Sequence, residues 1–265
     1  MIHEAGGYFY CDGANFNAIV GRVRPGDLGV DCMHINLHKT FSTPHGGGGP
    51  GSGPTVLSDA LSAFAPLPYV VKDGDRFRLV EHPGDADEKP FGRMKGFHDQ
   101  MGMFVRAIAY MLSHGKDGLR QVSGDAVLNA NYILASLKDV MTAPFGGPCM
   151  HEALFDDAFL KDTGVSTLDF AKAMIDEGFH PMTMYFPLVV HGAMLMEPTE
   201  TEGREALDEF IGSMRFLAEK AKAGDVDRFK NAPQLTPWRR LDETGAARKP
   251  VLRWTPPEPD QQAAE

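Results

Sequence analysis

Hydrophobic residues recur at helical spacing in three stretches of the chain. The first predicts a helix that ends at Gly115, with apolar residues at Phe97, Met101, Phe104, Val105, Ile108 and Leu112. A second helix is expected after Ser123 and before a break at 143–148, with Val127, Leu134, Leu137 and Met141 on one face. The clearest helix ends at Gly224 and carries Leu207, Phe210, Ile211, Met214, Leu217, Ala218 and Ala221. The chain is therefore expected to contain at least three amphipathic helices.

Shorter apolar runs predict strands before and between these helices. Tyr8–Cys11 is expected as a buried strand and Val30–Leu37 as a second strand. Further strand candidates are Met150–Phe155, Met182–Phe186 and Ala193–Glu197. This succession of strands and helices indicates an α/β region followed by an α+β region.

Two positions have the spacing of a capping box, in which the first side chain and the acid three residues later each bond the other's backbone N–H. Ser166 with Asp169 predicts the start of a helix that Gly178 closes. Thr199 with Glu202 predicts the start of the helix ended by Gly224.

The sequence divides into three expected regions. The helix end at Gly115 suggests a boundary there, so we expect a large-domain segment over 1–115 and a small domain over 116–231. The tail over 232–265 is rich in proline, and we expect it to be an extended wrap.

Composition narrows the class of protein. The 265 residues carry a net charge of −10, which gives no electrostatic basis for binding nucleic acid or an anionic membrane surface. We find no apolar run near the roughly 18 residues of a membrane span, and no secretory signal is expected. The three cysteines, Cys11, Cys32 and Cys149, lack the spacing of a disulfide framework, so we expect free thiols in the cytoplasm.

The candidate chemistry lies between residues 10 and 54. Asp12 is expected at the carboxyl end of a strand, where open α/β sheets bind ligands, and Lys39 follows the next strand. A lysine after a buried strand is consistent with a Schiff-base lysine, and an acid on the neighbouring strand with a partner for a pyridinium nitrogen. From spacing alone, the alternative that Asp12 caps a turn and Lys39 is a surface residue at a strand end remains open.

A glycine-rich loop follows Lys39. Six of the eight residues from Gly46 to Gly53 are glycine, so this stretch cannot form a regular helix or strand. We expect a loop whose backbone approaches another group closely or moves.

The amino-acid sequence of several segments resembles that of a known protein family. The run CDGANFNAIVGRVRPGDLGVDCMHINLHKTFSTPHGGGGPGSGP (11–54) closely resembles the pyridoxal-phosphate enzyme of the glycine cleavage system, the P-protein or glycine decarboxylase. The resemblance continues through 92–102, 118–133, 149–155, 178–202 and 230–233. The wording MTMYFPLVV looks most like the second subunit of the split bacterial form.

This resemblance implies a fold and a set of site residues. The expected fold is the aspartate-aminotransferase-like fold-type I of pyridoxal-phosphate enzymes, with a truncated large domain and an α+β C-terminal small domain. Lys39 matches the lysine that forms the Schiff base, and Asp12 matches the acid that faces the pyridine nitrogen. His38 and Thr40 are expected to contact the phosphate or ring. The loop residues His45, Gly46, Gly47, Gly48 and Gly49 are expected to border the active site.

The resemblance also implies an activity and partners. The cofactor would be pyridoxal 5'-phosphate, and the reaction would be glycine decarboxylation with transfer of the aminomethyl group to the lipoyl arm of the H-protein. The first P-protein subunit would be the partner, in a heterodimer or a dimer of heterodimers. Family members are much longer, so we expect a C-terminal fragment that on its own binds the cofactor weakly or not at all.

Two alternatives remain open. One is a different fold-type I pyridoxal-phosphate enzyme, such as a lyase or a desulfurase. The other is a fragment without catalytic activity.

Other polar residues carry weaker signals. The spacing of His34, His38 and His45 matches no metal site. His151 with Glu152 is interpreted as strand packing with a hydrogen bond. Glu197 to Glu200 could belong to the site, but the segment is interpreted as a strand end followed by a helix cap. His180 and Thr183 stay open between core positions and the edge of the active site.

Overall fold

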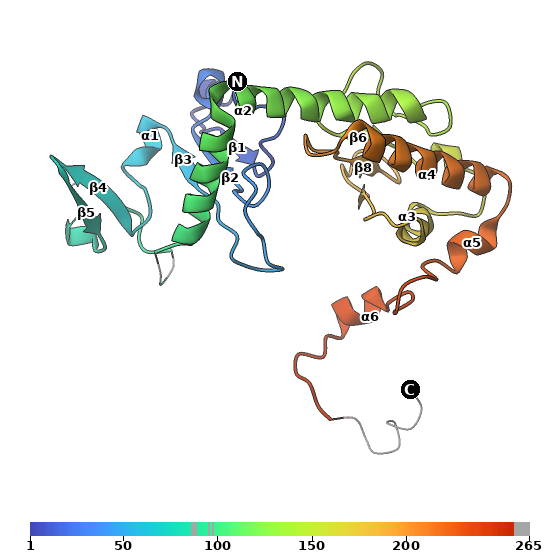
Figure 1. Cartoon of the computed structure of the whole chain (residues 1–265). Helices are drawn as coiled ribbons and strands as arrows, with labels where there is room; N and C mark the ends of the chain where they lie inside the picture. Colours follow the sequence, from blue (N-terminus) through green and yellow to red (C-terminus); the bar gives the residue numbers. More distant parts are fainter. Residues whose placement is uncertain (86–88, 95, 97, 257–265) are drawn as a thin grey trace. The chain divides into compact units, whose positions relative to one another are not determined.

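The chain folds into two compact units. The computed structural model describes residues 1–85, 89–94, 96 and 98–256 (Figure 1). The first unit comprises Met1–Leu134, Gly147–Ala153 and Glu197–Leu207, and the second comprises Ala135–Gly146, Leu154–Met196 and Asp208–Glu265. Each unit is thus assembled from segments that are far apart in the sequence. The boundaries expected at 115 and 231 stay a prediction.

A three-stranded sheet in the order β1-β2-β3 organises the first unit. β1 (Tyr10–Gly13) runs parallel to β2 (Cys32–Ile35), and β2 is antiparallel to β3 (Thr55–Leu57). Both predicted strands are therefore present, the first shifted by two residues and the second shorter than expected. The expectation that the first strand is buried was wrong: β1 is the outer strand of this sheet, and Tyr10 is 54% exposed.

Several short elements of the first unit were not predicted. They include a β-hairpin of β4 (Tyr69–Asp73) and β5 (Arg76–Val80), and the one-turn helix α1 (Asp59–Ser62). Three 3-10 turns complete the set: η1 (His3–Ala5), η2 (Pro25–Leu28) and η3 (Pro83–Asp85).

The long helix α2 (Met101–Leu137) is interrupted at Gly115, where φ is 63° and ψ is −175°. Figure 1 shows the ribbon changing direction at this point. The predicted helix end at Gly115 is confirmed, but the second helix starts immediately after it rather than after Ser123. Phe97 lies outside the described residues.

The first half of α2 buries only part of its apolar surface. Ala107 is buried, and Phe104 and Met111 pack against the same core, which also contains Val20, Leu37, Phe41 and Val122. The other predicted apolar positions are exposed, which contradicts a single buried face; they are Met101, Val105, Ile108 and Leu112. The core positions the candidate site because Leu37 and Phe41 are anchored in it on either side of Lys39.

The second unit contains most of a three-stranded sheet in the order β6-β8-β7. The strands are β6 (Ala153–Phe155), β8 (Met194–Met196) and β7 (Thr183–Met184), and β7 is antiparallel to β8. All three predicted strands are confirmed in shortened form. The 3-10 turn η4 (Ala158–Leu160) follows β6.

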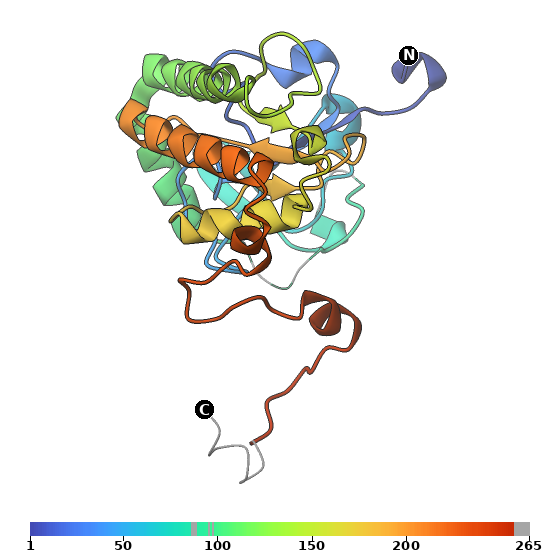
Figure 2. The same cartoon turned by 90° about the vertical axis from the view of Figure 1, so that its right-hand side faces the viewer.

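Helices pack beside this sheet. They are α3 (Thr167–Asp176), α4 (Arg204–Lys222) and α5 (Val226–Lys230) (Figure 2). The fully buried side chains of this core include Phe155, Phe170, Met174, Met194, Met214, Leu217 and Phe229. The predicted apolar face of α4 is thereby confirmed for the positions from Met214 to Ala221.

One of the two predicted capping boxes is present. At α3 the Ser166 side chain accepts from Asp169 N, and the Asp169 side chain accepts from Ser166 N. The second was wrong: α4 begins at Arg204, and the Thr199 hydroxyl pairs instead with the Thr201 hydroxyl at 2.7 Å.

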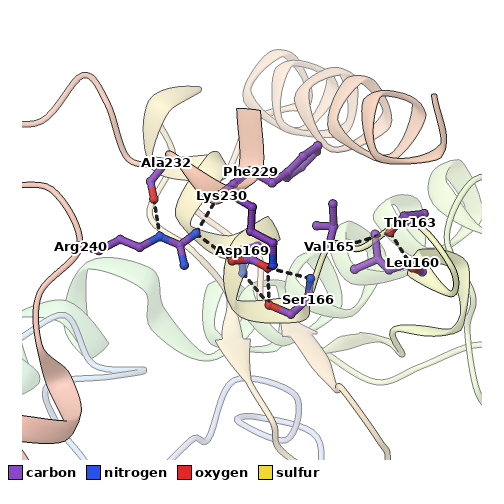
Figure 3. Close-up of polar contacts among 9 residues, drawn as sticks. All are labelled: Leu160, Thr163, Val165, Ser166, Asp169, Phe229, Lys230, Ala232 and Arg240. Atoms are coloured by element: carbon purple, nitrogen blue, oxygen red, sulfur yellow. Dashed lines mark hydrogen bonds and ion pairs between the residues drawn. The ribbon is translucent and has the colours of Figure 1, made fainter. Parts of the chain in front are cut away.

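The tail is tied to α3. Lys230 and Arg240 point toward the Asp169 carboxylate, at 2.5 Å and 2.9 Å (Figure 3). At the other end of α3, Asp176 accepts from the backbone N–H groups of Gln234 and Leu235. The extended wrap expected over 232–265 stays a prediction, and the short helix α6 (Glu243–Arg248) lies within this segment.

Within the described part of the chain, we find no helix with the length and apolar character needed to cross a bilayer.

Candidate functional site

Asp12 lies on β1 directly opposite His34 of β2. Its carboxylate is 3.5 Å from His34 Nε2, and the other ring nitrogen, Nδ1, is hydrogen-bonded to the Tyr10 hydroxyl. The Tyr10 and His34 rings are stacked with their centroids 6.0 Å apart. Partial removal from water and the nearby Asp12 carboxylate raise the pKa of Tyr10. His34 was considered from the sequence only as a possible metal ligand, and its place beside Asp12 was missed.

The Asp12 carboxylate has both a local and an outward role. Its Oδ1 accepts from Ala14 N at 2.9 Å, so Asp12 does cap a turn, as one alternative held. Its side chain is nevertheless 71% exposed. A charged acceptor on the open face of a strand can therefore also receive a proton-bearing group from a ligand.

Lys39 lies in the turn after β2 and is exposed. Its backbone is fixed by a hydrogen bond from Lys39 N to Asn36 O at 3.2 Å. Among the described residues its side-chain amine has no hydrogen bond or ion pair. The turn carries the side chain out to solvent, which agrees with the alternative of a surface position for Lys39.

Thr40 has a structural contact. It is buried, and its hydroxyl accepts from Phe16 N at 3.0 Å, which ties the turn carrying Lys39 to the turn that follows Asp12. A contact from Thr40 to phosphate stays a prediction.

His38 packs between the turn and the glycine loop. Its ring lies 4.7 Å from that of His45, between centroids, and its buried Nδ1 has no hydrogen-bond partner in the described structure. Burial, together with the neighbouring His45 and Lys39, lowers the pKa of His38. A Cβ at Gly51 would lie 3.1 Å from His38 Nδ1, so glycine there lets the loop pass over the ring.

The glycine loop forms a tight, exposed turn. Gly49 N donates to His45 O at 2.8 Å, and a Cβ on Gly46 would lie 1.8 Å from Gly49 O. The run from Gly46 to Gly49 has positive φ throughout. These glycines are required by the backbone, and their bordering of an active site stays a prediction.

Several buried side-chain polar atoms have no hydrogen-bond partner in the described structure, some of them in the segment that leads into and forms this loop. In the described residues they include His38 Nδ1, Thr43 Oγ1 and Ser52 Oγ, and both ring nitrogens of His151. Buried polar groups are normally hydrogen-bonded, so such atoms are available to a polar ligand. The exposed Lys39 amine, the exposed Asp12 carboxylate and these atoms fit a cofactor that carries an aldehyde, a ring nitrogen and polar substituents.

Glu197 also belongs to this region. Its Oε1 accepts from the side-chain amides of Asn15 and Asn17, the latter at 3.0 Å. Three residues on, Glu200 accepts from the Tyr110 hydroxyl at 3.0 Å. The interpretation of this segment as a helix cap was wrong, because both carboxylates bond to the first unit and α4 starts only at Arg204.

Glu152 is half-buried near Glu197 and Lys39. Burial raises its pKa; the neighbouring His151 and Lys39 oppose that effect and Glu197 adds to it. Glu152 is therefore more than a packing residue, because the charges of Lys39 and Glu197 affect its pKa.

Comparisons with known protein families and sequences identify relatives of this chain. Residues 122–237 match the family model described as glycine dehydrogenase, C-terminal domain. A relative from Caulobacter vibrioides, a probable glycine dehydrogenase (decarboxylating) subunit 2, is 74% identical over 97% of this chain and 49% of its own length. The expected resemblance to glycine dehydrogenase subunit 2 is confirmed. The relative of the same description from Staphylococcus haemolyticus is 52% identical over 96% of the chain and 51% of its own length.

The chain thus spans about half the length of the glycine dehydrogenase subunits it matches. Among solved structures, glycine decarboxylase (P-protein) of the glycine cleavage system has a TM-score of 0.66. It is 21% identical, and the match covers 82% of this chain and 49% of that one. The expected fold class, the α/β fold of this enzyme type, is therefore confirmed.

Proposed function

We propose that this chain acts in the pyridoxal-phosphate-dependent decarboxylation of glycine, as subunit 2 of a glycine dehydrogenase. The observation that carries the proposal is the presentation of the Lys39 amine next to the strand pair that holds Asp12, within a segment shared with the relatives. Transfer of the aminomethyl group to the lipoyl arm of an H-protein is part of the same proposal.

The chain's residues would hold pyridoxal phosphate in distinct ways. Lys39 would attach it through the side-chain amine, and Asp12 would pair with the ring nitrogen. His38 and Thr40 are the proposed further contacts, and the loop from His45 to Gly49 would border the bound group. When bound, this cofactor supplies an electron sink for the pair of electrons left behind when the glycine carboxylate is lost as carbon dioxide.

The contacts of Asp12 and Lys39 bear on their proposed roles. An ionised Asp12 would favour a proton on the ring nitrogen of a bound cofactor, and His34 Nε2 lies 3.5 Å from the carboxylate. The Lys39 amine would be free to reach a bound cofactor, because among the described residues it has no hydrogen bond or ion pair.

The partners belong to the proposal as well. We propose glycine as substrate, the lipoylated H-protein as acceptor and a first P-protein subunit as the structural partner, since the relatives are described as subunit 2. A cytoplasmic location is consistent with three free thiols, at Cys11, Cys32 and Cys149.

The test is a pair of lysine variants in the protein purified with its partner subunit. Pyridoxal phosphate should give a visible absorbance band with the wild type and with Lys72→Ala, which alters an exposed lysine of β4. Lys39→Ala should abolish the band, because Nζ is the proposed attachment atom.

The reaction itself is tested by exchange of labelled bicarbonate into the glycine carboxyl group in the presence of the lipoyl carrier. Exchange by the wild type and its loss in Lys39→Ala are expected. A wild-type protein that shows the band without exchange would indicate another pyridoxal-phosphate enzyme, such as a lyase or desulfurase. A Lys39→Ala protein that keeps both would exclude Lys39.

A further inference from the structure

The turn after Asp12 is held by a carboxylate from a distant segment. Glu197 follows β8, and its Oε1 accepts from the Nδ2 atoms of both Asn15 and Asn17. About 180 residues separate the carboxylate from the amides that it accepts from (182 for Asn15 and 180 for Asn17). Asn17 is only 4% exposed, so loss of its acceptor would leave a buried amide unpaired.

The same turn is fixed by two further contacts. Phe16 N donates to the Thr40 hydroxyl at 3.0 Å, and Asn17 N donates to Asn15 Oδ1 at 3.1 Å. The turn is thus attached on one side to the segment that carries Lys39 and on the other side to Glu197. Asp12 sits at its entrance, with Ala14 N bonded to Asp12 Oδ1.

Glu197 has the strongest of these attachments. Hydrogen bonds to an ionised carboxylate are roughly twice as strong as those between neutral groups, and here two amides share one carboxylate oxygen. In the described structure this contact takes the place of the helix-capping role that its position before α4 suggested.

We propose that Glu197 is a positioning residue that fixes the place of the Asp12 carboxylate relative to Lys39 through Asn15 and Asn17. The inference rests on the proposed function, which gives Asp12 its role, and extends it to a residue outside the segment that carries Asp12 and Lys39. Glu197 itself need not touch the cofactor or the substrate.

Two substitutions separate hydrogen bonding from charge. Glu197→Gln keeps an acceptor oxygen at the same distance from the backbone, whereas Glu197→Ala removes it. Glu200→Gln is the matched control, because it alters an acid of the same segment that bonds to Tyr110 and not to the turn. All are made in the protein purified with its partner subunit.

Three readouts are taken on each variant. In Glu197→Ala, hydrogen exchange over residues 10–20 should be faster, and kcat should fall roughly tenfold or more with a smaller change in KM, because the Asp12 carboxylate would no longer be held in place relative to Lys39. The pH profile of the visible cofactor band should also shift, since the pairing of Asp12 with the ring nitrogen sets it. Glu197→Gln should restore most of each property, and Glu200→Gln should match the wild type.

Contrary results are distinct. Hydrogen exchange over residues 10–20 that is as slow in Glu197→Ala as in the wild type would overturn the proposal. Faster hydrogen exchange there with an unchanged kcat and pH profile would also overturn it. A Gln variant as impaired as the Ala variant would also overturn it, because charge would then matter more than the hydrogen bonds. Failure of the proposed function has another signature: the wild type itself would lack the cofactor band, while exchange over residues 10–20 would still respond to Glu197→Ala.

Discussion

Single residues of the candidate site owe their positions to buried neighbours. Lys39 is exposed, but Leu37 and Phe41 on either side are anchored in the core against α2. Asp12 is likewise exposed, and its register with His34 and its bond from Ala14 N fix it. An amine and a carboxylate are thus displayed on backbone that is anchored by buried neighbours, which is what a preorganised site requires.

Asp12→Asn should leave the cofactor bound but slow glycine decarboxylation by two or more orders of magnitude. An amide cannot keep a proton on the ring nitrogen that it faces, so the ring becomes a weaker electron sink. The measurement is the rate of bicarbonate exchange, with the cofactor content checked by absorbance, in the protein with its partner subunit.

Asp27→Asn is the control for this substitution, because Asp27 is an exposed acid beside Arg24 on η2. It should exchange bicarbonate at the wild-type rate. Near-normal turnover in Asp12→Asn would mean that the acid facing the ring nitrogen lies elsewhere.

The sequence singled out some candidate site residues but did not show the contacts of others, for a physical reason. Lys39 and Asp12 lie in one continuous segment, so spacing and wording were enough to single them out. Glu197 and His34 act through contacts with Asn15 and Asp12, which only the folded chain brings together. Local patterns carry no information about such pairs.

At the scale of elements, α2 depends on one residue. Gly115 separates its two helical halves at φ 63° and ψ −175°, a region of backbone conformation open almost only to glycine. Both halves contribute to the first core, through Ala107 before the break and Val122 after it. The conformation at Gly115 is therefore required for both to pack there.

Gly115→Ala should lower the free energy of unfolding by about 1–3 kcal/mol, because alanine is strained in this conformation. The measurement is denaturant unfolding followed by circular dichroism. Gly102→Ala lies in the same helix with no atom within 4 Å of the added Cβ, and should be neutral or stabilising by up to about 1 kcal/mol. Equal destabilisation by both changes would contradict the argument.

Elements were predictable where one local signal sufficed. The capping box at Ser166 and the apolar face of α4 are both local patterns, and both are present. The β4–β5 hairpin was not predicted although Gly74-Asp75 is a recognised two-residue hairpin turn signal, because its strands bear mixed charged and apolar residues and are largely exposed. The capping box expected at Thr199 failed because the segment is used instead for contacts to Asn15, Asn17 and Tyr110.

At the scale of the whole molecule, stability against acid depends on how the tail is attached. The Asp169 side chain is 4% exposed. Its carboxylate accepts a hydrogen bond from Ser166 N and forms ion pairs with Lys230 and Arg240 (Figure 3). Arg240 also donates to Ala232 O at 2.8 Å and to Phe229 O at 2.7 Å, so it joins the tail to α5 and α3. One buried acid therefore holds three segments of the second unit.

Asp169→Asn should destabilise the chain at neutral pH and lose this effect in acid. Burial alone would raise the pKa of Asp169, but hydrogen bonds from Lys230, Ser166 and Arg240 outweigh it and lower the pKa to about 2 from 3.8. A carboxyl whose pKa is lower in the folded state stabilises that state above its unfolded pKa, here by about 2 kcal/mol, and this stabilisation is lost as the pH falls through 3.8 toward 2.

Unfolding by denaturant at pH values from 7 down to 2 should show the stabilities of wild type and Asp169→Asn converging below about pH 4. Asp227→Asn, at an exposed position of α5, should follow the wild type throughout. A gap between wild type and Asp169→Asn that stayed constant down to pH 2 would show that packing of the side chain, and not its charge, stabilises the fold.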